Sequence, residues 1–215
     1  MKTKKNDFIE IDFIARTKDD NKIFDLTRKE DAIKFNLHDE KHSYHSLVIC
    51  LGYNDIIKGL DEELIDKEPG KYTIEVSVEK AFGKKTHNLI KLIPTSIFHT
   101  QNIKPFPGLK VNIDNIYGTV LSVSGGRTIV DFNHPLAGKD LLYEVEIKRI
   151  INDTKEKVES FLKLIDKDAK FILNDDKLEI ETKLNDENMK KELVEEIKKR
   201  IPEIKEVSFK TTTLE

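Results

Sequence analysis

The stretch from Ile49 to Leu64 constrains the fold of this chain more than any other segment. It combines an apolar strand, a tight turn at Gly52 and a short helix that we predict over residues 56–65. The apolar positions of that helix share one face, which predicts burial of that face. Because the helix would begin with the adjacent Ile56 and Ile57, it could form the floor of an apolar pocket. The competing interpretation is that both isoleucines belong to an ordinary core.

Alternating apolar and polar residues before and after this stretch predict a sheet. Residues 8–15 predict a half-buried strand, whose apolar face holds Ile9, Ile11, Phe13 and Ala15. Further strands are predicted at residues 23–25, 71–78 and 141–150. Residues 28–46 are polar and have little periodicity, so they predict a bulged loop with room for one helical turn.

The character of the sequence changes after Lys85. Short strands are predicted at 109–114, 117–123 and 127–132, and Gly125-Gly126 is a hairpin signal between the last two. We therefore expect a small all-β module. Its apolar residues exceed what so small a module readily buries: Ile90, Leu92, Ile93, Ile97, Phe98 and Ile103. They form either an exposed binding surface or the core of the module itself.

A different pattern begins at Asn152. Asp153 with Glu156 three residues later resembles a capping box, and it opens a helix with apolar residues at helical spacing. The predicted order of elements is α-β-β-α-β, with two helices on one face of a three-stranded sheet. The second helix carries an apolar stripe: Met189, Leu193, Ile197 and Ile201. This stripe is read most simply as core, and a dimer interface is the alternative.

The composition excludes some partners. Lys and Arg number 37 against 40 Asp and Glu, so the net charge of −3 gives no global positive field to hold a nucleic acid. No window approaches the roughly 18 apolar residues of a membrane span. The single cysteine, Cys50, lies in an apolar run and suits a buried position in a reducing compartment. We expect a cytoplasmic protein.

Four short motifs, in this order, resemble the FK506-binding type of prolyl isomerase. They are Phe24-Asp25, Ile56-Ile57-Lys58-Gly59-Leu60, Ala81-Phe82-Gly83 and Tyr143-Glu144-Val145-Glu146-Ile147. A fifth motif, residues 130–139, is similar to the SlyD branch, in which an insert-in-flap chaperone domain follows the Ala-aromatic-Gly turn. The remaining residues are similar to the long archaeal members of that branch.

The resemblance implies an α+β protein of three parts. An isomerase domain, termed here the body, would span residues 1–86 and 133–151, with an FKBP-like antiparallel sheet wrapped on a short helix. Residues 87–132 would form the insert, a small all-β chaperone domain. Residues 152–215, the C-terminal unit, would be an accessory or dimerisation domain. The implied activity is cis/trans isomerisation of X-Pro bonds in unfolded or partly folded clients, without a cofactor and with the insert holding the client.

The resemblance also assigns roles to individual residues. The implied catalytic residues are Asp25, Phe82 and Tyr143. The implied proline-binding residues are Phe13, Phe24, Leu47, Ile56, Ile57 and Leu60. The implied client-binding residues of the insert are Ile90, Leu92, Ile97 and Phe98. Phe82 and Phe13 stand where the family has tyrosines, so two hydroxyl groups are missing and tight binding of the macrolide inhibitor is in question.

Several of these residues have simpler interpretations. Asp25 could orient the twisted carbonyl group of a substrate, or it could end a strand as an Asx-turn residue. His38, His42 and His45 have spacings that a metal could use, but they lack cysteine partners and a fixed ligand pattern, so we expect no metal. His134 is expected to be a structural turn residue.

Two other functions compete with the enzyme. The missing hydroxyl groups favour a holdase chaperone with weak or lost isomerase activity. A weaker alternative is an assembly scaffold in which the C-terminal unit is the working part.

Overall fold

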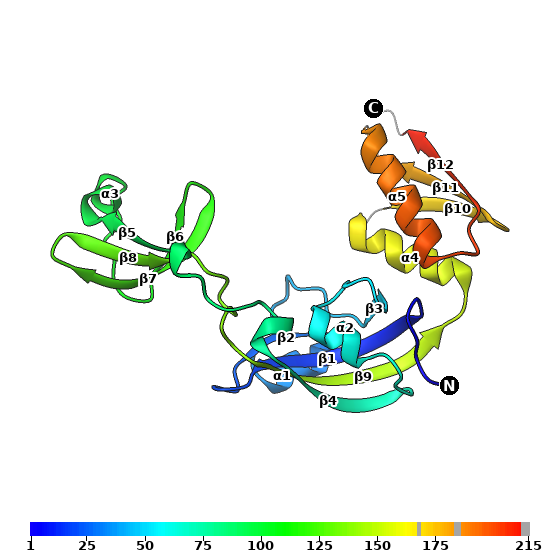
Figure 1. Ribbon diagram of the computed structural model, residues 1–215, viewed down its shortest axis with the longest axis horizontal. Coiled ribbons are helices and arrows are strands. Elements are labelled where there is room, and N and C mark those ends of the chain that lie inside the picture. Colours follow the sequence, from blue (N-terminus) through cyan, green and yellow to red (C-terminus); the bar gives the residue numbers. More distant parts are fainter. Residues whose placement is uncertain (167–168, 183–185, 212–215) are drawn as a thin grey trace.

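The computed structural model describes residues 1–166, 169–182 and 186–211 of the chain, and within them the strands form three separate sheets (Figure 1). The protein is therefore a mixed α/β protein with mostly antiparallel strands. In Figure 1 the insert and the C-terminal unit rise from opposite ends of the five-stranded sheet, on the same side of it.

The five-stranded sheet belongs to the body. Its strand order is β2-β1-β9-β4, and β3 also pairs with β1. The strands are β1 (Phe8–Thr17), β2 (Ile23–Leu26), β3 (Leu47–Cys50), β4 (Gly70–Val76) and β9 (Leu141–Ile151). All pairings are antiparallel. The predicted apolar face of β9 is buried, with Leu141, Tyr143, Val145 and Ile147 in the main core.

Strand β1 is buried on both faces, so the prediction of a half-buried strand was wrong. One face packs into the main core as expected, through Ile9, Ile11, Phe13 and Ala15. On the other face Ile14 packs with Leu26 and Ala32. Phe8, at the start of the strand, packs with the C-terminal unit. Alternation within one strand does not reveal that distant segments cover its second face.

The two helices of the body are shorter than a regular core helix. Residues 28–46 contain α1 (Lys29–Lys34), and α2 covers Lys58–Glu63 instead of residues 56–65. Ile57 is the N-cap residue, and its extended ψ of 139° keeps it outside the helix. Its carbonyl oxygen accepts the first helical hydrogen bonds, from the N–H groups of Leu60 and Asp61. Ile56 and Ile57 therefore lie on the loop that enters α2, where β-branched side chains lose less rotamer freedom.

The insert contains a four-stranded antiparallel sheet of order β5-β8-β7-β6. Its strands are β5 (Ile90–Pro94), β6 (Lys110–Ile113), β7 (Ile116–Ser124) and β8 (Arg127–Asp131). The hairpin at Gly125-Gly126 is confirmed, since both glycines have positive φ, as a two-residue hairpin turn requires. The insert is not all-β, because a helix, α3 (Thr95–Thr100), follows β5 at Pro94. Phe98 of this helix is buried in the core of the insert.

The C-terminal unit follows the order α4 (Thr154–Ile165), β10 (Lys170–Asn174), β11 (Lys177–Thr182), α5 (Glu187–Arg200) and β12 (Glu206–Thr211). Strand β11 pairs antiparallel with β10 and parallel with β12. The side chain of Asp153 accepts from the N–H of Glu156, which confirms the cap predicted there. Met189 is 51% exposed and lies outside the core, because it is in the first turn of α5. The sequence predicts strands at 178–184 and 207–212 in this unit, and of these residues 183–184 and 212 lie outside the described residues.

Two 3-10 turns lie between β4 of the body and β5 of the insert: η1 (Val78–Lys80) and η2 (His87–Leu89). Val78 was expected to continue strand β4, but it begins η1 instead. Its N–H donates to the carboxylate of Asp140 (2.9 Å) rather than to a neighbouring strand. This turn brings the chain to Phe82.

The close approach of α2 to β4 generates a stability prediction. A Cβ atom at Gly59 would lie 2.4 Å from Cγ1 of Val76 and 2.9 Å from Cβ of Lys80. We expect Gly59→Ala to lower the free energy of unfolding by about 1–3 kcal/mol, the usual cost of overpacking. Denaturant unfolding measures the change. Lys58→Ala, at an exposed position of the same helix, is the matched control and should shift stability by under about 0.5 kcal/mol. Equal effects would contradict the close packing.

Candidate functional site

Three aromatic rings form one wall of the candidate site on the core side of the five-stranded sheet. The ring of Tyr143, from β9, lies between those of Phe13 on β1 and Phe24 on β2. The ring centroids of Phe13 and Tyr143 are 5.7 Å apart, and those of Phe24 and Tyr143 are 6.2 Å apart in an edge-on arrangement. Aromatic pairs prefer tilted or edge-on arrangements, so contacts among the three rings stabilise this wall.

The structure brings the other apolar candidates to the same place. Leu60 is fully buried in the main core, and Leu47, Ile56, Ile57 and Phe82 pack against that core while remaining partly accessible. The strand β3, the loop before α2 and the turn after η1 each supply part of this group. All eight apolar residues that the sequence suggested for the body therefore lie against one cluster.

Asp25 follows Phe24 at the edge of this cluster. Its carboxylate accepts a hydrogen bond from the N–H of Leu26 (2.8 Å). The side chain is accessible to solvent, yet desolvation by the surrounding residues raises its pKa, and the Leu26 N–H and nearby His42 partly oppose that shift. This hydrogen bond reaches the next residue, whereas an Asx turn joins the side chain to the N–H two residues on, so it does not form the Asx turn considered above.

Tyr143 is the one candidate ring of this cluster that carries a hydroxyl group. Burial, and to a smaller extent the charge of Asp25, raises the pKa of its phenol. The hydroxyl group therefore stays protonated at neutral pH and can donate a hydrogen bond. Since Phe13 and Phe82 have no hydroxyl group, Tyr143 and Asp25 are the polar groups of this part of the site.

The ring of Phe82 is held by a residue that the sequence analysis treated only as a turn residue. His134 stacks on Phe82 with ring centroids 4.1 Å apart and planes 6° apart. Nδ1 of His134 accepts from the N–H of Leu136 (3.2 Å), so the imidazole also caps its own turn. A backbone bond from Gly138 to Gly83 joins the same two segments. Its place in the SlyD-like motif at 130–139 was the signal that could have linked His134 to the site.

A hollow of about 260 Å³ adjoins Asp25. It is lined by residues of β2 and of the polar loop: Ile23, Phe24, Asp25, Leu26, Leu37, Asp39, His42 and Tyr44. His38 and His42 pack against the ring of Tyr44, at centroid distances of 5.6 and 4.6 Å. In the part of the chain that the structure describes, no three His, Cys, Asp or Glu side chains gather as a metal would require.

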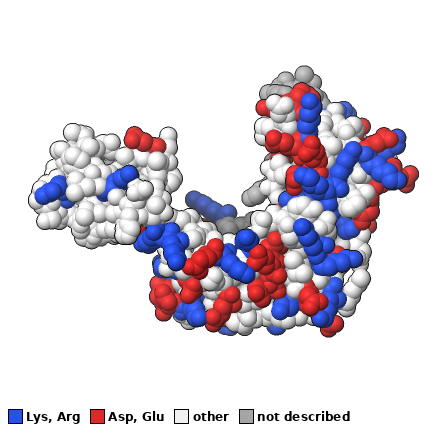
Figure 2. Space-filling view, viewed as in Figure 1, with Lys and Arg blue, Asp and Glu red and all other residues white. Residues whose placement is uncertain are grey.

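The client-binding residues suggested for the insert differ in their exposure to solvent. Leu92 is 57% and Ile97 43% exposed, and Ile90 is partly buried. Phe98, at 2%, is a core residue and cannot contact a client, because its helix turns it inward. The sequence analysis missed five exposed residues of the insert: Leu89, Phe106, Ile116, Tyr117 and Leu121. Figure 2 shows the insert as a mainly uncharged surface in this view, whereas charged side chains crowd the rest.

Two further findings concern the chain as a whole. Among the helices of the described residues, none is long and apolar enough to cross a membrane. Burial raises the pKa of the Cys50 thiol to about 12, so the thiol is protonated and unreactive at neutral pH.

Comparisons with known proteins identify relatives of the chain. Residues 91–136 match the family model described as FKBP26, IF domain. The chain is 27% identical over 148 residues to the short-type peptidyl-prolyl cis-trans isomerase of Methanocaldococcus jannaschii, covering 68% of this chain and 93% of that protein. It is 27% identical over 164 residues to the FKBP-type peptidyl-prolyl cis-trans isomerase SlyD of Haemophilus influenzae, covering 74% and 77%.

A third relative has a higher identity over a shorter alignment. The probable FKBP-type 16 kDa peptidyl-prolyl cis-trans isomerase of Pseudomonas fluorescens is 33% identical over 103 residues, which are 45% of this chain and 67% of that protein. Together with the insert match and the SlyD similarity, this relation assigns the family. The chain belongs to the FKBP-type peptidyl-prolyl cis-trans isomerases and is a SlyD-like member that carries an insert-in-flap segment.

Proposed function

We propose that this protein catalyses cis/trans isomerisation of X-Pro bonds in unfolded or partly folded polypeptides in the cytoplasm. The observation that carries the proposal is the single apolar cluster of Phe13, Phe24, Ile56, Ile57 and Tyr143 with Asp25 at its edge. Residues 1–86 and 133–151 would act as the isomerase domain. The names of its relatives give the same activity.

The chemistry needs no covalent step and no cofactor. The barrier of about 18–20 kcal/mol arises because twisting the peptide bond breaks amide resonance. The planar amide is more dipolar than the twisted one, so an apolar site disfavours the ground state more than the transition state. Ile56 and Ile57 would contact the proline ring. Asp25 and the Tyr143 hydroxyl group would interact with the twisted amide, where a preorganised polar group is most effective.

A second function follows from the missing hydroxyl groups. Phe13 and Phe82 leave fewer hydrogen-bond donors for a substrate carbonyl group. The insert, by contrast, exposes Leu92, Phe106, Ile116 and Tyr117, each more than half accessible. This combination favours a holdase chaperone with weak isomerase activity as the alternative.

We propose that the insert, residues 87–132, holds the client chain. Its exposed apolar side chains would bind apolar segments of unfolded proteins, since a charge-poor apolar surface on a small unit is characteristic of binding sites. The C-terminal unit, residues 152–215, would be an accessory unit, and a homodimer through it is a further proposal that sizing of the full chain tests.

The direct test of the function is a refolding assay whose rate is limited by proline isomerisation. We expect micromolar protein to accelerate the slow phase of an unfolded substrate protein. A protease-free assay of proline isomerisation in a short peptide should show the same activity. Binding of the unfolded substrate without any acceleration would replace the enzyme with the holdase.

The role of Asp25 predicts a pH dependence. If the carboxylate interacts with the twisted amide, kcat/KM should fall as the pH falls through the raised pKa of Asp25, which lies above the ordinary value of 3.8. Asp25→Asn should lower kcat/KM by about tenfold, equivalent to about 1.4 kcal/mol, and should abolish this pH dependence. Asp39→Asn, at another residue that lines the adjoining hollow, is the control. An unchanged profile in Asp25→Asn would leave the carboxylate with only its hydrogen bond to the N–H of Leu26.

The role of the insert predicts a separation of two activities. Replacing Phe106, Ile116 and Tyr117 together by serine should weaken refolding catalysis by at least about tenfold, because each removes a large apolar contact. Isomerisation of a short proline peptide should stay within about twofold of wild type, since the pocket is unchanged. Ile172→Ser, at an exposed apolar position of the C-terminal unit, is the matched control. Equal loss on both substrates would contradict the separation.

A further inference from the structure

We propose that the C-terminal unit positions the proline-contacting residues Ile56 and Ile57, and that Arg200 is the positioning residue through which it acts. This inference rests on the proposed isomerase function. It gives the C-terminal unit a role within each chain, independent of any dimer. The evidence is a set of contacts between the end of α5 and the loop that precedes α2.

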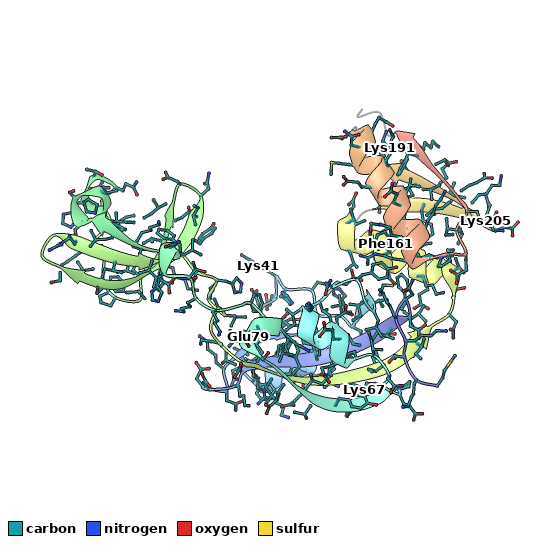
Figure 3. The ribbon with its side chains drawn as sticks, in the orientation of Figure 1. Lys41, Lys67, Glu79, Phe161, Lys191 and Lys205 are labelled. Carbon is teal, nitrogen blue, oxygen red and sulfur yellow. The ribbon has the colours of Figure 1, made fainter. Side chains whose placement is uncertain are left out.

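The central contact is an ion pair between Arg200 and Asp55. Nη1 of Arg200 lies 2.6 Å from Oδ1 of Asp55, and the two side chains are only 10% and 8% exposed. The guanidinium group lies between two rings, 4.4 Å from the centroid of Tyr53 and 4.7 Å from that of Phe161. Phe161 belongs to α4, the helix of the C-terminal unit nearest the body (Figure 3). A planar cation stacked between rings and bound to a carboxylate has one preferred orientation.

Asp55 connects this contact to the candidate site, because it directly precedes Ile56 in the chain. Its second carboxylate oxygen accepts from the N–H of Cys50 (2.9 Å), at the end of β3. Asp61, buried in α2, accepts from the N–H groups of Gly52 and Asn54. The loop between β3 and α2 is therefore held at Gly52 and Asn54 by Asp61 of α2, and at Asp55 by Arg200.

The neighbouring residues extend the contact. The carbonyl oxygen of Lys199 accepts from the hydroxyl group of Tyr53 (2.9 Å) and from the amide of Asn6 (3.1 Å). Carbonyl groups at the end of a helix lack intrahelical partners, so the body supplies them here. Phe8, Cys50 and Ile151 of the body belong to the same hydrophobic cluster as α4 and α5. The C-terminal unit thus packs against the body and fixes one loop of it in a specific position.

A buried ion pair adds little stability compared with apolar residues of the same size, because both charges lose their hydration. Its geometry is directional, however, and it fixes Asp55 relative to α5 in a way that apolar packing does not. A site that acts by excluding water needs its apolar floor in a fixed place, and displacements of about 1 Å lower rates severely. Loss of the ion pair should therefore affect catalysis beyond its effect on stability.

The test compares full-length variants at a temperature where all are folded. Arg200→Met removes the cation and keeps an unbranched side chain between the two rings, and Asp55→Asn is isosteric and can still accept from Cys50. Glu196→Gln is the matched control, because Glu196 contacts the Nε atom of Arg200 at the exposed side and leaves Asp55 in place. The measurements are kcat and KM on a short proline peptide, the Kd for a permanently unfolded protein, and amide hydrogen exchange over residues 52–58.

We expect both variants to exchange faster over residues 52–58 and to lose about tenfold in kcat/KM on the peptide, mainly in kcat. The Kd for the unfolded protein and the exchange within the insert should not change, whereas general destabilisation would move them all. Glu196→Gln should match wild type. If Arg200→Met does not fold, Asp55→Asn alone decides.

Two results would overturn the proposal: unchanged exchange over residues 52–58, or faster exchange there with unchanged kcat/KM. An inactive wild-type protein would instead refute the isomerase function. The exchange measurement would still show whether Arg200 fixes the loop, so the two failures are distinguishable.

Discussion

The burial of strand β1 on both faces is the constraint on which the rest of the structure depends. Its inner face supplies Ile9, Ile11 and Phe13 to the core behind the candidate site, and its first residue, Phe8, enters the cluster of the C-terminal unit. It pairs with β2, β3 and β9. A strand with these neighbours ties the core of the body to the cluster of the C-terminal unit, because its backbone and both its faces are packed.

The sequence predicted those parts of the fold that depend on local patterns. The alternation of β9, the two-residue turn at Gly125-Gly126 and the cap at Asp153 each depend on residues close together in the chain, and each is found. The errors have non-local or competing causes. The second face of β1 is covered by segments that its own sequence does not reveal. Helix α2 begins after Ile57 because the backbone of Ile57 is extended. The spacing of the apolar residues from Ile56 onward suits a helix as well and therefore did not reveal this start.

The candidate site shows the same division. The resemblance to a known family identified the eight apolar residues that the structure brings together. Six of them lie in the short motifs, and Phe13 and Leu47 lie outside them. His134 was missed because its stacking on Phe82 joins two segments on opposite sides of the insert. Phe98 was misassigned because a run of apolar residues does not distinguish inward from outward positions when an unexpected helix, α3, interrupts the strands.

The stacking of His134 on Phe82 also bears on why a phenylalanine is compatible with the proposed chemistry. A tyrosine at this position would offer a hydroxyl group, but a hydrogen bond of ordinary strength contributes only about 0.5–1.5 kcal/mol net. That range corresponds to about tenfold in rate or less. The imidazole of His134 stacks on one face of the Phe82 ring and so fixes the orientation of that apolar surface. If desolvation is the larger part of the rate enhancement, the orientation of the ring at this position matters more than its hydroxyl group.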